Sequence, residues 1–388
     1  MPAAASTHPR FNLLRRALCA RACAATAGVG LAGLLAACSP PPALRIGFIG
    51  GITGRVADIG TAGRNGVQLA VDDLNAAGGI NGRAVELLIR DDEQNDDVAR
   101  RHLSELADAG VQLIIGPMTS SIAVALAPMA MQRGLALVSP TATAHELTGK
   151  ADAFFRVVSD APRSAIHQAE FLYAQGHRSM AAIADLKNKA FSQSWSSSAL
   201  RRFGELGGRV ALDTTFESNP GVEYAELARQ LLQAKADVIL IVASAADSAM
   251  LIQHLRRGDA QIQLTTSSWA GTGQLIQLGG RAAEGTLVPQ LFDRASQAPL
   301  YLQFVARFQQ RYGEAPGFGA VNGYDATLLG AKAIRQRREG QSVLEAMRAI
   351  RSHGGLQRDF ALDEFGDSGA PKFLARIQNG QFVLIDQR

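Results

Sequence analysis

Short apolar runs alternate with amphipathic stretches along most of this chain, and no other feature of the sequence constrains its fold as strongly. Residues 44–49 read as a buried strand, and the apolar residues between 67 and 74 recur at the spacing of one helix face. The same pattern predicts further strands at 85–89, 112–115, 135–138, 154–157, 180–184, 209–216 and 237–243, and helices at 98–109, 120–133, 162–175, 191–206, 223–234 and 247–257. Strands that alternate with helices in this way favour parallel sheets with helices on both faces.

The last third of the chain has a different order, in which three helices are followed by short strands. The pattern predicts helices at 299–312, 322–335 and 343–350, and strands near 358–362, 372–378 and 382–385. A break near residue 158 separates two comparable strand and helix series, and the chain is longer than one hydrophobic core usually serves. We therefore predict an α/β fold of two open parallel-sheet lobes, with a ligand cleft between them at the carboxyl ends of the strands.

The first 37 residues have the pattern of a secretory signal peptide. They contain four arginines and no acidic residue, and residues 22–37 form an uncharged stretch that is too short to span a bilayer. The stretch ends in Leu35-Ala36-Ala37-Cys38, which resembles the lipobox of bacterial lipoproteins; an ordinary cleavage site that contains a cysteine is the alternative. We expect residues 1–37 to be removed, Cys38 to be lipidated, and residues 38–43 to form a short proline-rich tether on the periplasmic side of a bacterial membrane.

Cleavage before Cys38 has two consequences for the chemistry of the protein. It removes Cys19 and Cys23, so no pair of cysteines is left for a disulfide, and cysteine catalysis and thiolate metal sites are excluded. It also removes the whole formal charge of +4, because the rest of the chain carries equal numbers of basic and acidic residues. Since phosphate binding needs a net basic face, we expect no nucleic-acid partner.

The sequence lacks the motifs of several common enzyme classes. Gly47, Gly50, Gly51 and Gly54 do not match GxGxxG, and a long loop is expected between them and the first helix, which argues against a dinucleotide site. The phosphate-binding P-loop motif, the GxSxG nucleophile motif and the zinc-binding HExxH motif are also missing. We therefore predict no catalytic residue, no cofactor and no metal site, and we do not expect an enzyme.

Several separate motifs carry a resemblance to a known family. They are NGVQLAVDDLNAAGGINGR at 65–83, IGPMTSS at 115–121, SPTATAHELT at 139–148, GRAAEGTLV at 280–288 and GYDATLLGAKAI at 323–334. Together they resemble the branched-chain amino-acid (leucine) binding proteins of ABC transporters, and the resemblance covers nearly all of residues 44–388. It implies a type I periplasmic binding protein fold in its lipoprotein form, which binds a small solute without catalysing a reaction.

The resemblance also implies how the two lobes share the chain. Residues 44–158 and 291–368 would form the N-terminal lobe, and residues 159–290 and 369–388 the C-terminal lobe. A three-strand hinge would join them, with crossings near 157–160, 286–292 and 366–372. Closure of the lobes on a ligand would then be a rotation about these three crossings.

Hydroxyl residues in two first-lobe loops are the first group of candidate ligand contacts. Ser120 and Ser121 begin a predicted helix, where a hydroxyl and free backbone N–H groups suit a carboxylate, although a plain helix cap is the simpler interpretation. Thr141 and Thr143 follow the strand that ends near residue 138. In the family, the positions that match Ser120, Thr141 and Thr143 hold the ligand's carboxylate and amine.

The sequence departs from the family where the ammonium group of an amino acid is bound. The family's acidic residue falls near Ser268 and Trp269, within residues 264–273, which contain no Asp or Glu. Asp247 and Asp185 are candidate replacements; the plainer interpretation makes them an ordinary helix-start and an ordinary strand-end carboxylate. An amino acid would therefore need a different partner for its ammonium group from the one that the family uses.

Four other side chains differ from the family or extend its pattern. Phe191 stands where the family has a tyrosine at the start of a second-lobe helix, and Ile59 stands where the first lobe has an aromatic residue. Arg55 offers a bidentate partner for a second carboxylate, or is a solvated loop residue. Trp269 would stack on the ligand as the lobes close, or pack under the second lobe.

These features together favour an exported lipoprotein that closes on an amino acid or a related small carboxylate. In this interpretation the protein delivers the solute to an ABC importer whose permease and ATPase are separate chains, and the lipid anchor is its only contact with the membrane. The alternative is a lipoprotein of the same fold that acts as a ligand sensor or regulates an envelope enzyme, because a fold does not fix a function.

Overall fold

The computed structural model describes residues 1–2 and 41–387, and all its helices and strands lie between Leu44 and Gln387. The predicted signal peptide from residue 3 onward, the lipidation site Cys38 and part of the predicted tether lie outside the described residues. The first sheet has five parallel strands in the order β2-β1-β3-β4-β5. Its strands are β1 (Leu44–Gly50), β2 (Val85–Asp91), β3 (Leu113–Ile115), β4 (Ala136–Ser139) and β5 (Phe154–Arg156).

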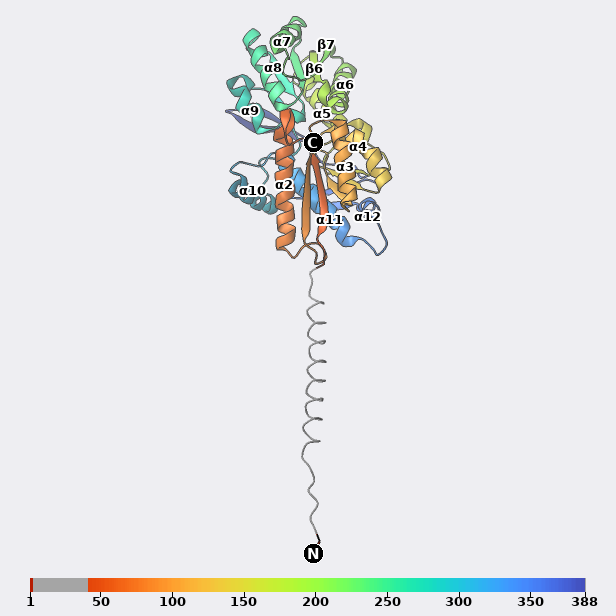
Figure 1. The fold of residues 1–388 in the computed structure, drawn as a ribbon. Coiled ribbons are helices and arrows are strands. Elements are labelled where there is room, and N and C mark those ends of the chain that lie inside the picture. Colours follow the sequence, from red (N-terminus) through yellow and green to blue (C-terminus); the bar gives the residue numbers. More distant parts are fainter. Residues whose placement is uncertain (3–40, 388) are drawn as a thin grey trace. The chain divides into compact units, whose positions relative to one another are not determined.

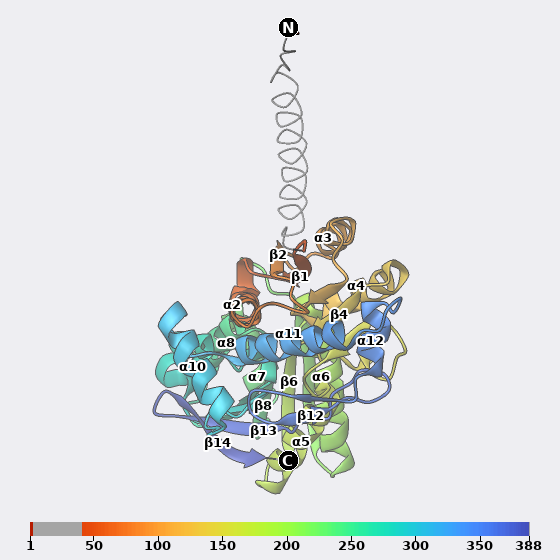
Figure 2. The same cartoon turned by 90° about the horizontal axis from the view of Figure 1, so that it is seen from below.

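The second sheet has seven strands in the order β14-β13-β10-β9-β8-β6-β7. Its parallel strands are β6 (Ser179–Asp185), β7 (Arg209–Phe216), β8 (Val238–Val242), β9 (Gln263–Thr266) and β10 (Leu287–Gln290). The antiparallel strands β13 (Phe373–Gln378) and β14 (Gln381–Gln387) complete it, and β14 forms the edge beside the C-terminus (Figure 2).

Helices cover the two sheets and define two lobes. The first lobe has the five-stranded sheet with α2 (Ala57–Ala76), α3 (Asp96–Asp108), α4 (Ser120–Arg133), α10 (Pro299–Tyr312), α11 (Phe318–Gln336), α12 (Val343–Ala349) and the hairpin of β11 (Ser352–Gly354) and β12 (Asp359–Ala361). The second lobe has the seven-stranded sheet with α5 (Ala161–Ala174), α6 (Lys189–Glu205), α7 (Tyr224–Gln233), α8 (Ala245–Gly258) and α9 (Gly273–Gly279). Figure 1 shows the second lobe above the first. None of the helices in the described part of the chain has the length and apolar character that a membrane crossing requires.

Within the described residues the chain passes between the lobes three times, after β5, after β10 and between β12 and β13. The first and third crossings are tied together by Arg156. Its backbone N–H donates to the carbonyl oxygen of Gly366 at 3.1 Å, and its guanidinium lies 2.7 Å from the carboxylate of Asp367. The two parallel-sheet lobes and three crossings confirm the predicted fold class, whereas the predicted residue limits of each lobe stay a prediction.

Two sequence predictions need correction, and one region had no predicted element apart from the hinge crossing near 286–292. Residues 258–299 hold β9, α9 and β10. The helix predicted at 322–335 begins earlier, at Phe318. The long loop expected before the first helix is also wrong, because a short 3-10 helix, η1 (Gly54–Val56), and then α2 follow β1 closely.

Glycines explain why the start of α2 was missed. Gly60, Gly63 and Gly66 replace the apolar side chains that would mark a helix face, because close neighbours leave no room for them. Gly66 lies against the backbone of α11, Gly63 against the side chain of Met118, and Gly60 against the backbone of Gly51. A Cβ atom added to Gly66 would lie 2.1 Å from the carbonyl oxygen of Ala320, and one added to Gly323 would lie 2.8 Å from that of Gly63. Direct contact between the two helices therefore fixes the end of α2 that faces the second lobe.

We predict that Gly66→Ala lowers the free energy of unfolding by about 2–3 kcal/mol, because the new methyl group forces α2 and α11 apart. Gly204→Ala in α6 is the matched control, since a Cβ atom there meets no heavy atom within 4 Å and alanine is the better helix former. Urea unfolding of both variants measures the difference. Equal stability of the two variants would contradict the proposed helix contact.

Candidate functional site

A small cavity lies between the lobes at the carboxyl ends of strands from both sheets. Its volume is about 20 Å³, which is enough for about one water molecule. The first lobe contributes loops that follow β3 and β4, and the second lobe contributes residues that follow β6 and β9. The lining residues are Ile59, Met118, Thr119, Ser120, Thr141, Asn188, Phe191, Ser268, Trp269, Leu291 and Phe318.

The N-terminus of α4 forms the first-lobe wall of this cavity. Ser120 ties two loops together, because its hydroxyl oxygen accepts hydrogen bonds from the backbone N–H groups of Thr143 at 3.0 Å and Ala144 at 3.1 Å. These two bonds do not use the hydroxyl hydrogen of Ser120, which can still donate. Thr119, the N-cap residue of α4, makes no side-chain cap hydrogen bond.

The remaining predicted hydroxyl residues have different surroundings. Thr141 lines the cavity, and its hydroxyl donates to the carbonyl oxygen of Met118. Thr143 is buried close by, and its hydroxyl oxygen has no hydrogen-bond partner among the described residues. Ser121 bridges the lobes instead: its backbone N–H donates to Asn188 at 3.1 Å, and its hydroxyl accepts from the backbone N–H of Ala190 at 3.2 Å.

Two aromatic rings form the second-lobe wall. Phe191 in the first turn of α6 and Trp269 in the 3-10 helix η4 (Ser268–Ala270) make an edge-to-face pair with ring centroids 5.9 Å apart. The indole Nε1 of Trp269 is buried and has no hydrogen-bond partner in the described part of the chain. Both residues were predicted, and both line the cavity.

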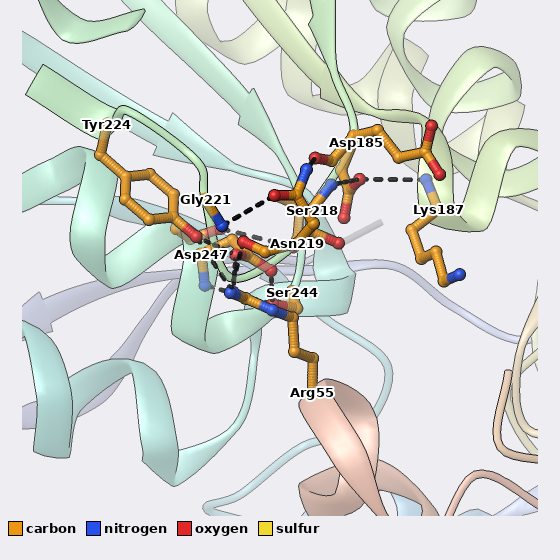
Figure 3. A network of polar contacts seen from close by, with 12 residues as sticks. Arg55, Asp185, Lys187, Ser218, Asn219, Gly221, Tyr224, Ser244 and Asp247 are labelled. Atoms are coloured by element: carbon orange, nitrogen blue, oxygen red, sulfur yellow. Dashed lines mark hydrogen bonds and ion pairs between the residues drawn. The ribbon is translucent and has the colours of Figure 1, made fainter. Parts of the chain in front are cut away.

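Arg55 and Asp247 bind each other rather than facing the cavity (Figure 3). The Asp247 side chain is completely buried, and its carboxylate accepts from Arg55, from the hydroxyl of Tyr224 and from the hydroxyl of Ser244. Arg55 also donates to the Tyr224 hydroxyl at 3.0 Å and to the carbonyl oxygen of Asn219 at 2.9 Å. The two residues were predicted separately as ligand contacts, and the structure joins them in a bridge between the lobes.

Burial and charge shift the pKa values of the groups around this bridge. Burial lowers the pKa of Arg55, but the charge of Asp247 and the hydrogen bond with Tyr224 raise it more, so the guanidinium stays protonated. Burial and the bond to Asp247 raise the pKa of Tyr224 to about 12. Burial also raises the pKa of Asp185, one of whose oxygens accepts from the backbone N–H groups of Lys187 and Ser218, each at 3.0 Å.

Further contacts bridge the lobes on either side of the cavity. Thr272 of the second lobe donates to the carboxylate of Asp58 in the first turn of α2 at 2.7 Å, and burial raises the pKa of that carboxyl. The backbone N–H of His145 donates to the hydroxyl of Ser194 at 3.0 Å. The small cavity and these bridges together describe lobes that are closed on each other.

A larger hollow of about 470 Å³ lies beside α6, β6 and β7 of the second lobe and is also lined by His145 and Glu146 of the first lobe. His145, Arg201 and Asp213 are among its lining residues. We place the candidate site in the smaller cavity, because that one lies between the two sheets and contains buried polar atoms without partners. The described residues contain no group of three His, Cys, Asp or Glu side chains that suits a metal ion.

Several lining residues were not among the predicted site residues. Met118 and Thr119 stand next to Ser120 and could have been included with it as neighbours in the same loop. Leu291 lies on a crossing segment and Phe318 at the start of α11, and both are far from the other site residues in sequence. Only the three-dimensional fold brings them to the cavity.

Comparison with known proteins places the chain in a family. The sequence model described as "Periplasmic binding protein" matches residues 43–381. The chain belongs to the periplasmic binding protein family. This match, together with relatives named as Leu/Ile/Val-binding proteins, confirms the family predicted from the sequence.

Individual relatives agree with this assignment. The leucine-, isoleucine-, valine-, threonine- and alanine-binding protein of Pseudomonas aeruginosa is 23% identical over 330 residues, which cover 83% of this chain and 87% of that protein. A leucine-binding protein, LivK, of Thermotoga maritima has the same fold with a TM-score of 0.80 at 24% identity, over 89% of this chain and 98% of that one. A solute-binding protein of an ABC transporter from R. palustris, solved with benzoate, also gives a TM-score of 0.80, at 20% identity over 89% of this chain and 96% of that one.

We predict that Arg55→Ala opens the lobes of this periplasmic binding protein, because the buried Asp247 carboxylate then loses its cation and gains from exposure to water. About a third of the Arg55 side chain is exposed, so we expect a loss of about 1–3 kcal/mol of closure free energy rather than the full cost of breaking a buried pair. Small-angle X-ray scattering should show a larger radius of gyration. Arg45→Ala is the control, since Arg45 and Glu86 form an exposed pair within the first lobe, and identical scattering from Arg55→Ala and the wild type would contradict the prediction.

Proposed function

We propose that this protein captures an amino acid or a related small carboxylate outside the cytoplasm and delivers it to the permease of an ABC importer. The observation that carries the proposal is the cavity between the lobes, which is formed by the carboxyl ends of both sheets and by the N-terminus of α4. Ligands of open α/β folds bind at this edge of the sheets. The names of the relatives, which bind branched-chain amino acids or benzoate, support a carboxylate as the shared chemical group.

The N-terminus of α4 suits a carboxylate on electrostatic grounds. The aligned peptide dipoles of a helix give its N-terminus a partial positive charge, and α4 has no acidic residue in its first turn to neutralise it. The Ser120 hydroxyl adds a neutral donor at the same point. In this proposal Ser120, Thr141, Phe191 and Trp269 contact the solute directly, whereas Ser121, Arg55 and Asp247 join the lobes around it.

Capture of a solute requires the lobes to separate and close again. A cavity of about 20 Å³ admits about one water molecule, so a solute reaches the site only when the bridges of Arg55 and Asp58 are broken. The three crossing segments would serve as the hinge, and closure would bury the solute between the two walls. Such a motion presents a different surface to a permease in the open and closed forms.

The place of this function in the cell rests on the N-terminal sequence. The pattern of residues 1–37 and the motif at Cys38 support export and a lipid anchor on the periplasmic side of a bacterial membrane. A tethered solute-binding protein works with separate membrane chains, which would supply the pore and the ATPase. No enzymatic step is part of this function.

The proposal predicts that protein stripped of bound compounds by unfolding and refolding is stabilised by one class of carboxylate. A ligand at about 100 times its Kd adds about 2.7 kcal/mol to the free energy of unfolding, which thermal unfolding against amino acids, dicarboxylates, amides and aromatic acids would detect. Ser120→Ala should weaken this ligand about 10-fold or more, because a donor to a charged group is lost. Ser104→Ala on the exposed surface of α3 should have no effect.

Mass spectrometry of compounds extracted from the natively purified protein is an independent test of solute capture. A retained carboxylate that also stabilises the refolded protein would support solute capture. If no compound is retained and none in the panel stabilises the protein, solute capture is contradicted. The regulator of an envelope enzyme would then be the function to pursue.

A further inference from the structure

We propose that the solute of this protein is a carboxylate without a free amine, and that the indole Nε1 of Trp269 and the hydroxyl of Thr119 select it. This inference rests on the proposed solute-binding function and names the substrate class of the same cavity. Two observations support it. Some polar groups of the residues that line the cavity have no hydrogen-bond partner, and the acidic groups near the cavity already have theirs.

Two residues that line the cavity each carry a buried polar group without a hydrogen-bond partner among the described residues. The Nε1 atom of Trp269 and the hydroxyl oxygen of Thr119 are both inaccessible, in side chains that are only 5% and 3% exposed. An indole N–H can only donate, so Trp269 requires an acceptor from a ligand or a water molecule. Leaving such a donor buried and unpaired is unfavourable, which makes these positions strongly selective for an acceptor.

The two residues that carry these groups line the same cavity from opposite lobes. Thr119 stands at the N-cap position of α4 in the first lobe, and Trp269 lies in η4 of the second lobe. A carboxylate carries two acceptor oxygens, so one molecule can accept from both lobes at once. The positive end of α4 and the Ser120 hydroxyl favour the same negative charge. The solute carboxylate would therefore complete the hydrogen bonding of both walls as the lobes close.

An ammonium group would find no available carboxylate in this cavity. No lining side chain in the described part of the chain carries a charge. Asp247, a candidate ammonium-binding acid from the sequence, already accepts from Arg55, Tyr224 and Ser244, as Figure 3 shows. An amine could use Asp247 only by displacing Arg55 from a fully buried carboxylate, which is costly.

Asp58 and Asp185 are also committed to other partners. Asp58 accepts from Thr272 across the lobes, and Asp185 accepts from two backbone N–H groups after β6. Neither residue lines the cavity. Arg55 of the first lobe is thus the counter-ion of Asp247 in the second lobe. Its guanidinium takes the place at this carboxylate that the ammonium group of an amino acid would need.

The rest of the cavity wall indicates the body of the solute. Ile59, Met118, Phe191, Leu291 and Phe318 surround the polar end with apolar surface. Apolar groups gain most from such a wall, and an aromatic ring can also stack against Phe191 or Trp269. The inferred substrate class is a carboxylic acid with a branched aliphatic or aromatic body.

Isothermal titration calorimetry with matched pairs of ligands tests this inference on protein refolded to remove bound compounds. The pairs are 4-methylpentanoate with L-leucine and 3-phenylpropanoate with L-phenylalanine, which differ only in the α-amino group. We expect the acid of at least one pair to bind about 100-fold more tightly than its amino acid, because the buried ammonium would have no partner.

Two variants test the assigned donors. Trp269→Phe keeps an aromatic ring and removes the N–H, and Thr119→Val keeps the shape and removes the hydroxyl. Each should weaken the acid about 10- to 100-fold while leaving the thermal unfolding of the ligand-free protein near that of the wild type. Thr215→Val, in the larger hollow beside α6, is the matched control and should bind the acid like the wild type.

The outcomes separate this inference from the function on which it rests. Amino acids that bind as tightly as their deaminated acids would overturn the inference and leave solute capture intact, and so would unchanged acid affinity in both Trp269→Phe and Thr119→Val. A retained solute without any carboxylate would also overturn it. If neither member of any pair binds and no compound is extracted from native protein, both the inference and solute capture fail.

Discussion

A carboxylate with no exposed surface needs a cation, and in this protein the cation comes from the opposite lobe. Asp247 lies under the second lobe's surface at the start of α8, and Arg55 reaches it from the segment that leads into α2. Separating the lobes would leave Asp247 without its partner. Together with the contacts of Thr272 with Asp58 and of His145 with Ser194, this ion pair holds the lobes closed, and neither of its charges lines the cavity.

The contact between α2 and α11 places Arg55 where this pair can form. Because glycines let the two helix backbones touch, the beginning of α2 is held rigidly against the first lobe. Arg55, Asp58 and Ile59 lie on neighbouring turns there, and they serve two separate tasks. The charged residues join the lobes, and Ile59 lines the cavity. The beginning of α2 therefore contributes to both lobe closure and ligand binding, through different side chains.

The alternation of strands and helices was enough to predict the fold, because each buried strand and each amphipathic helix leaves its own periodicity. This alternation gave no prediction where the buried face of a strand or helix is not made of apolar side chains. Thr265 and Thr266 of β9 are polar residues that are nevertheless buried, and the glycines of α2 hide its first turns. The family resemblance located Ser120, Thr141, Phe191 and Trp269 at the cavity, but the pairing of Arg55 with Asp247 joins residues 192 positions apart and has no signal in a single sequence.

A crystal structure of the protein with 4-methylpentanoate tests the central claim most directly. The account predicts a carboxylate within hydrogen-bond distance of both Trp269 Nε1 and the Thr119 hydroxyl, with Arg55 still bound to Asp247. It would be contradicted by a ligand in the larger hollow beside α6. A ligand that occupies Asp247 while Arg55 points into solvent would contradict it equally.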